Sequence, residues 1–349
     1  MEMKRSSKRF SLGLFFVATL CFCMASPLWA QTDGSSQSED EQFLIAEQMT
    51  PSEEGESLIS EQKVVQKEEE LPTPEQKTAI GEEKSLPSKE EIPLEKKEFL
   101  TRGQKTLLLN VGGLALVFAY GLWKWDYGQN SFDFVNEGYF GRTTEYGGAD
   151  KLGHFWSSYA MCHLYSYVYR KWGYTDSEAN LYGALSNLGF QTFMELADGF
   201  SPSQKFSWQD MSMNVLGSVL GYVWGTFPSL ARKIDFRIEY KPYFSSKDTE
   251  FSTKYDRQTF LIAVKADGFD FIKNSYLKYL EFQVGYNARG YKDFEEGVHD
   301  DRHRTIYVGL GFNVSRLIQT ALNTRIFDYV QIPYTAVRYG INLDKGKGY

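Results

Sequence analysis

The chain has 349 residues and a formal net charge of −7, and this charge is unevenly distributed. Residues 31–100 hold 19 acidic and 7 basic residues, whereas residues 101–349 hold 25 acidic and 27 basic residues and are nearly neutral. A nearly neutral folded region has no basic surface for nucleic acid, so nucleic-acid binding is excluded as a function class. The three cysteines, Cys21, Cys23 and Cys162, form no cluster of the kind that holds structural zinc.

The first 30 residues have the order of a secretory signal peptide. Four basic residues lie within residues 4–9, an apolar run covers residues 12–24, and two small residues follow it. The run is shorter than the roughly 20 residues of a membrane span, so the pattern predicts a signal that is cleaved after Ala30. An uncleaved anchor is the alternative. We therefore expect export to the cell envelope, either to the periplasm or to a membrane-associated position.

The two N-terminal cysteines do not favour lipid attachment. Cys21 follows Leu20 and Cys23 follows Phe22, whereas a lipidated cysteine normally follows a small residue. Once the signal is removed, Cys162 is the remaining cysteine, and an intrachain disulfide cannot form.

Residues 31–100 are expected to form a disordered acidic tether. They are rich in Glu, Lys, Ser, Gln and Pro and contain two aromatic residues, Phe43 and Phe99. A segment of this composition buries too little apolar surface to offset its loss of conformational entropy. An acidic tail that binds a partner is the alternative.

Four helices are predicted between residues 101 and 230. The segments are Thr106–Trp125, about 150–172, about 176–197 with Asp176 as N-cap, and about 207–228 with Ser207 as N-cap. The first segment is apolar nearly throughout and borderline in length, so a membrane-crossing helix and a buried helix remain alternatives. The last segment carries Gly217, Gly221 and Gly225, a stripe that lets another helix approach closely.

From residue 234 onward, apolar and polar residues alternate with the period of two that is typical of strands. The expected strands are near 236–240, 259–265, 280–289, 306–313 and 335–343. The pattern predicts antiparallel strands with one face toward water. Five or six strands are fewer than the eight of the smallest bacterial outer-membrane barrels, so we expect a small sheet or a partial barrel. The run His299–His303 predicts a solvated loop, with adventitious metal binding as the alternative.

Three of the predicted helices carry polar side chains four residues apart in an apolar context. The rows are Asp150, His154 and Ser158; Asn187, Gln191 and Glu195, extended by Asp198; and Asp210 with Asn214. If the rows face one another, they form a network whose candidate site residues are Asp150, Lys151, His154, Glu195, Asp198, Asp210 and Asn214. Its carboxylates outnumber Lys151 and His154, so the network needs a further cation, a shared proton or water.

Two interpretations of this network stay open. In the structural one, the acidic residues cap helices and pair with Lys151, and His154 is a hydrogen-bonded core residue. In the catalytic one, Lys151 and His154 are electrostatic partners of an acid or base, which is Glu195, Asp198 or Asp210. The pattern indicates no particular cofactor or metal.

The motifs within residues 120–228 resemble those of the YfiM-like family of predicted bacterial periplasmic lipoproteins. The resemblance rests on Asp150-Lys151-x-x-His154, on Glu195-x-x-Asp198, and on Asp210-x-x-x-Asn214 with Gly217. A fainter likeness to VanZ-like membrane proteins rests on the same order of residues. The resemblance implies an envelope location and a helical architecture but no reaction, and the cysteines of this chain depart from the lipoprotein pattern.

Together these patterns predict an α+β protein. Its expected parts are a signal peptide at 1–30, a disordered acidic tether at 31–100, a four-helix membrane-associated bundle at 101–230, and an antiparallel β domain at 233–349. The expected function is that of a non-catalytic envelope component that docks to membrane lipid or to another envelope protein. The alternative is an envelope enzyme that acts on a lipid or glycan, although the chain has neither a nucleophile-elbow motif nor a P-loop.

Overall fold

The computed structural model describes residues 99–241, 255–291, 300–322 and 324–345, which combine helices and sheets in an α+β structure, as predicted. The predicted signal peptide lies outside the described residues, and so does the predicted tether except for Phe99 and Leu100. The described helices are α3 (Arg102–Lys124), α4 (Ala149–Lys171), α5 (Asp176–Asp198), α6 (Trp208–Thr226), the short α7 (Pro228–Lys233) and α8 (Val314–Leu322). The sequence patterns predicted α3 to α6 and missed α7 and α8.

Side-chain caps determine where two of the long helices begin. Thr175, and not Asp176 as predicted, is the N-cap of α5, because its hydroxyl accepts from the Glu178 N–H while the Glu178 carboxylate accepts from the Thr175 N–H. This reciprocal pair is a capping box. Ser207 caps α6 as predicted, since its hydroxyl accepts from the Asp210 N–H.

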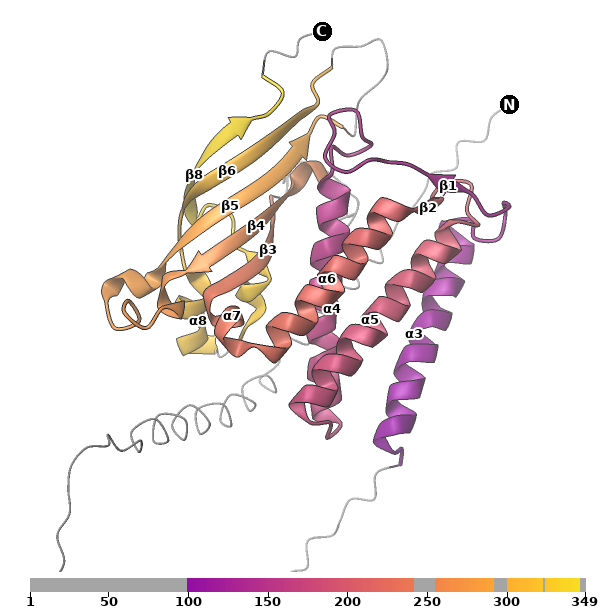
Figure 1. The fold of residues 1–349 in the computed structure, drawn as a ribbon, viewed down its shortest axis with the longest axis horizontal. Coiled ribbons are helices and arrows are strands. Elements are labelled where there is room, and N and C mark those ends of the chain that lie inside the picture. Colours follow the sequence, from indigo (N-terminus) through magenta and orange to yellow (C-terminus); the bar gives the residue numbers. More distant parts are fainter. Residues whose placement is uncertain (1–98, 242–254, 292–299, 323, 346–349) are drawn as a thin grey trace, which may run out of the picture. The chain divides into compact units, whose positions relative to one another are not determined.

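Helix α4 packs against both α5 and α6, which also pack against each other, while α3 packs on α5 (Figure 1). Two glycines of the predicted stripe lie at the contact between α6 and α4, whereas Gly225 lies against Asn180 of α5. A Cβ atom on Gly217 would lie 2.3 Å from the Phe155 carbonyl oxygen, and one on Gly221 would lie 2.6 Å from the Cys162 Cβ. Only glycine permits this approach, so the stripe fixes how closely the polar rows of α4 and α6 face each other.

The main sheet has six strands in the order β7-β3-β4-β5-β6-β8. Its strands are β3 (Ile234–Tyr240), β4 (Gln258–Lys265), β5 (Leu280–Arg289), β6 (His303–Phe312), β7 (Val330–Gln331) and β8 (Ala336–Asn342). Neighbouring strands from β3 to β8 pair antiparallel as predicted, whereas β7, which the alternation missed, pairs parallel with β3. Two further short strands, β1 (Phe134–Val135) and β2 (Phe206–Ser207), pair parallel beside the helices.

One face of this sheet is partly exposed, as predicted, and the side chains that it exposes over β5, β6 and β8 are apolar. The polar side chains that alternate with apolar ones along β3 and β5 are buried, among them Arg237, Glu281 and Gln283. The apolar side chains of β6 and β8 are exposed instead, with Leu310 61% and Val337 85% accessible. Alternation separates the two faces of a strand but does not say which one is covered.

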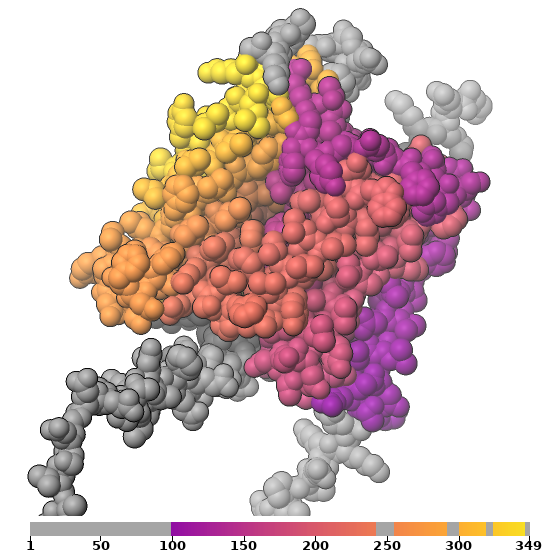
Figure 2. Space-filling view, in the orientation of Figure 1, coloured from indigo at the N-terminus to yellow at the C-terminus, as the bar shows by residue number. Residues whose placement is uncertain are grey.

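The helices and the sheet share one hydrophobic core. The ring of Phe236 on β3 lies 5.2 Å from each of the rings of Phe155 and Tyr159 on α4, and the Trp156 indole donates to the Tyr329 carbonyl. Helix α7 contacts β3 and β4. The space-filling view shows the salmon atoms of the helical region adjoining the orange atoms of the sheet (Figure 2). The predicted domain boundary near residues 230–233 therefore falls where helical and sheet residues are in contact.

Candidate functional site

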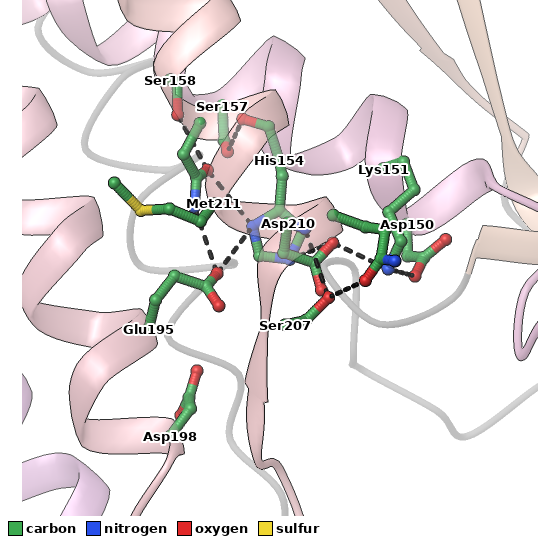
Figure 3. A network of polar contacts seen from close by, with 12 residues as sticks. Asp150, Lys151, His154, Ser157, Ser158, Glu195, Asp198, Ser207, Asp210 and Met211 are labelled. Atoms are coloured by element: carbon green, nitrogen blue, oxygen red, sulfur yellow. Dashed lines mark hydrogen bonds and ion pairs between the residues drawn. The ribbon is translucent and has the colours of Figure 1, made fainter. Parts of the chain in front are cut away.

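The polar rows meet where α4 and α6 begin and α5 ends. Lys151 lies at the centre of one side, fully buried, with its ammonium 2.6 Å from Asp150 Oδ2 and 2.9 Å from Asp210 Oδ1 (Figure 3). It also donates to the carboxylate of Glu137, which comes from the loop before α4. Three carboxylates thus surround one ammonium group.

His154 lies one helical turn after Lys151 and links the second group of residues. Its Nδ1 is 3.2 Å from Asn214 Oδ1 and 3.6 Å from Glu195 Oε1, and its Nε2 is 3.6 Å from Asp210 Oδ1. Asn214 donates from Nδ2 to Glu195 Oε1 at 3.1 Å, and its Oδ1 accepts from the Ser158 hydroxyl at 3.0 Å. Three helices therefore contribute to one connected set of contacts.

Asp198 lies beside this set and has a partner of its own. Its Oδ1 accepts a 2.8 Å hydrogen bond from the phenol of Tyr127, which lies just after α3. Burial raises the pKa of Asp198 to about 6, against the lowering effects of Tyr127 and His154. Asp198 is therefore a neighbour of the network that titrates near neutrality.

The side chains of the network are largely removed from water, and burial dominates their titration. Burial raises the pKa of Glu195 to about 8 and that of Glu137 to about 7, and the nearby carboxylate of Asp210 adds to both effects. Burial alone would raise the pKa of Asp210, but His154 and Lys151 lower it below its usual value. Burial alone would lower the pKa of His154, but Asp210 and Glu195 raise it. Glu195 and Glu137 thus hold a proton more readily than Asp210, which stays ionised.

The charges of this network do not balance. Five carboxylates lie in or beside it, whereas its cationic groups are Lys151 and His154. Two buried carboxylate oxygens, Asp150 Oδ1 and Asp210 Oδ1, accept no hydrogen bond, even though the latter is within ion-pair distance of Lys151. The network can therefore take up protons or a cation.

The structure brings together six of the seven predicted site residues and places the seventh, Asp198, alongside. Whether these residues form a site or a structural network stays a prediction. The sequence patterns missed Glu137 and Tyr127, because both lie in the segment between α3 and α4, where no periodicity marks them. Asn187, from the same row as Glu195, instead donates to the Ser218 hydroxyl further along α6.

A family model described as predicted periplasmic lipoprotein (DUF2279) matches residues 136–226. No curated protein and no solved structure matches the chain. The matched residues include Glu137 and all seven predicted site residues, and exclude the main sheet. Cys21 and Cys23, the cysteines considered for lipid attachment, lie outside both the match and the described residues. From residue 136 to residue 226 the chain is thus similar to a predicted periplasmic lipoprotein family, consistent with an exported, envelope-associated protein.

Proposed function

We propose that this protein is a non-catalytic, membrane-associated component of the cell envelope that contacts lipid through an apolar surface of its sheet and helices. The observation that carries the proposal is that the six-stranded sheet exposes apolar side chains on one face while the polar side chains of its other face are buried. Soluble proteins seldom expose a contiguous apolar patch of this kind, and such patches mark interaction surfaces with proteins or membranes.

The exposed apolar surface extends over four neighbouring strands. Its members on β4, β5, β6 and β8 are Ile262, Phe282, Val284, Val308, Leu310, Phe312, Val337, Tyr339 and Ile341. The strand register sets them side by side, since Phe282 is opposite Leu310, which in turn is opposite Val337. We call these nine residues the sheet patch. In β-structure that faces lipid, the apolar side chains point outward and the polar side chains point inward.

The helices extend this apolar character. Helix α3 is the one helix among the described residues that is long and apolar enough to cross a membrane, and only 11% of its most apolar stretch is buried. Exposed apolar side chains also follow α5 and α6, namely Leu181, Leu185, Leu196, Val215, Leu216 and Val219. A core helix of a soluble protein would be mostly buried, so the exposure of α3 supports contact with a bilayer.

Backbone hydrogen bonding limits how deeply the sheet can enter lipid. β8 ends the strand order and pairs only with β6 among the described strands. An unpaired strand edge in hydrocarbon leaves backbone groups without partners, at a cost of several kcal/mol for each group. We therefore place the sheet patch against the membrane interface, where water reaches the edge of β8, and propose that the exposed side of α3 contacts the bilayer.

A fluorescent label on either face of β8 tests this proposal. Val337 belongs to the sheet patch, whereas Asn342 on the same strand alternates to the opposite face and is also exposed. Val337→Cys and Asn342→Cys would each be labelled with an environment-sensitive dye in a chain with Cys21→Ser and Cys23→Ser, because the native Cys162 is only 1% exposed. On reconstitution into phosphatidylethanolamine and phosphatidylglycerol vesicles, we expect a blue shift of the emission at residue 337 and none at residue 342. Equal emission at the two positions would refute contact between the sheet patch and lipid.

An envelope enzyme acting on a lipid or glycan is the second candidate function. The observation that favours it is the side chain of His154, which is 29% exposed while it contacts the buried Glu195 and Asp210. A carboxyl group whose pKa is raised to about 8, as burial raises that of Glu195, suits a general acid near neutral pH. Glu195→Gln keeps the shape of the protonated carboxyl and removes its proton chemistry. A folded Glu195→Gln protein that complements a deletion strain normally would eliminate the catalytic function.

A further inference from the structure

The two ring nitrogens of His154 have different surroundings, and the difference determines which of them can bind a ligand. Nδ1 lies 3.2 Å from Asn214 Oδ1, and the amide of Asn214 is oriented by its donation to Glu195 and its acceptance from Ser158. An oxygen acceptor at this distance requires a hydrogen on Nδ1. In the neutral imidazole, Nε2 therefore carries a lone pair.

The lone pair of Nε2 and the carboxylate oxygen Asp210 Oδ1 lie 3.6 Å apart. Two acceptors next to each other repel, and 3.6 Å is also too long for a hydrogen bond from a protonated ring. Asp210 Oδ1 accepts no other hydrogen bond, and Asp210 is 7% exposed. The partner of this oxygen is the ammonium of Lys151, 2.9 Å away, which also pairs with Asp150 and Glu137.

This separation suits a shared metal ion. Two ligands that are each about 2.1 Å from a tetrahedral zinc ion lie roughly 3.4 Å apart. Glu195 supplies a further oxygen, and the three ligand atoms of His154, Glu195 and Asp210 lie within 4.8 Å of one another. We propose that His154 Nε2, Asp210 and Glu195 bind one divalent first-row transition-metal ion.

The chemistry of the ligand set decides the class of metal. One imidazole with two carboxylates suits zinc, manganese or ferrous iron, whereas calcium and magnesium prefer oxygen ligands alone. A second acidic group, formed by Glu137, Asp150 and Asp210, also has the spacing of a metal site. The ammonium of Lys151 lies within that group, so the cation position there is filled.

A dication at His154 also accounts for the charge of the network. Five carboxylates lie in or beside it against one permanent cation, Lys151. Buried charges need partners, and a bound dication removes half of this excess of four negative charges. His154 is 29% exposed at its side chain, which gives the ion a route from solvent.

The test uses zinc as the probe. The full chain is purified in detergent, stripped of metal with a chelator and then incubated with zinc. We expect one zinc ion per chain after gel filtration, and a higher melting temperature with zinc than with magnesium or calcium. His154→Gln and Glu195→Gln should each weaken zinc binding at least tenfold. His303→Gln is the matched control, because His303 belongs to the loop that is the alternative metal binder in the sequence, and it should bind zinc normally.

Cobalt is the second probe, and its absorption between 500 and 650 nm reports nitrogen and oxygen ligands directly in the folded wild-type protein. Absence of stoichiometric zinc, or undiminished binding by His154→Gln, overturns the proposal. If His154→Gln fails to fold, Glu195→Gln and the cobalt spectrum of the wild type decide the question. The proposed membrane contact is measured separately by the label on residue 337, so either proposal can fail alone.

Discussion

Two buried charged clusters stabilise different halves of this protein, and they differ in how their charges balance. The sheet cluster lies on the covered face of the main sheet and comprises Asp235, Arg237, Glu239, Lys265, Glu281 and Arg338. The helical cluster comprises Glu137, Asp150, Lys151, His154, Glu195, Asp198 and Asp210. The first has three carboxylates and three cations, whereas the second has five carboxylates around Lys151 and His154.

The contacts of the sheet cluster balance its charges, although Glu239 Oε1, Glu281 Oε2 and Arg338 Nη2 make no hydrogen bond. Arg237 donates to Asp235, Glu281 and Gln331, and Lys265 donates to the second oxygen of Asp235 at 2.7 Å. A network that neutralises itself needs no ligand and serves the fold. The helical cluster, with its unequal charges, retains a capacity for protons or a cation, and this difference is the physical reason to look for function there.

The largest expected effect comes from removing the central cation of the sheet cluster. Arg237→Met leaves Asp235 and Glu281 buried with fewer partners, and should lower the free energy of unfolding by about 3–5 kcal/mol. Denaturant unfolding in detergent measures the change. Arg232→Met is the control, since the Arg232 side chain is 46% exposed and its pair with Asp270 should contribute less than about 1 kcal/mol. Similar values for the two variants would show that the sheet cluster does not stabilise the fold.

The next effect concerns the close packing that brings the helical cluster together. Gly217→Ala places a Cβ atom 2.3 Å from the Phe155 carbonyl oxygen, so α4 and α6 must separate, at a cost of about 1–3 kcal/mol. The control is Gly189→Ala on α5, where a Cβ atom meets nothing within 4 Å and helix propensity favours alanine by about 1 kcal/mol. A neutral Gly217→Ala variant would show that the helices do not need this approach.

The third expected effect concerns the pH dependence that Glu195 of the helical cluster gives to stability. Because burial raises the pKa of Glu195 from 4.5 to about 8, the native state holds a proton that the unfolded state releases above about pH 5. The stability from this group is complete below pH 4.5 and is lost as the pH rises through 8. Its contribution to the slope is at most about 1.4 kcal/mol per pH unit. Glu195→Gln should flatten the dependence of unfolding free energy on pH between 5 and 8, and an unchanged slope would contradict the proton assignment.

The smallest effect tests whether Asp198 belongs to the helical cluster. Tyr127→Phe removes the 2.8 Å hydrogen bond to Asp198, at a cost of about 0.5–1.5 kcal/mol. If Asp198 is a neighbour rather than a ligand, zinc binding should not change in this variant. A loss of zinc binding as large as that of His154→Gln would place Asp198 inside the site.

Local patterns in the sequence determined much of the helical region. The spacing of four residues predicted the faces that converge, because residues four apart lie on one side of a helix. The short polar side chain of Ser207 marked the start of α6, and the glycines at 217 and 221 marked the close contact with α4. These features depend on residues within a few positions of one another, so a single sequence reveals them.

Tertiary structure alone decided which face of the sheet is covered and which residue completes the helical cluster. Alternation along β5 separates Glu281 from Phe282, but packing of distant segments determines which of the two is buried. Glu137 joins Lys151 from a loop without periodicity, and the parallel strand β7 joins β3 across 92 positions from Ile238 to Val330. Such contacts depend on the path of the chain in space, and no local period in the sequence encodes them.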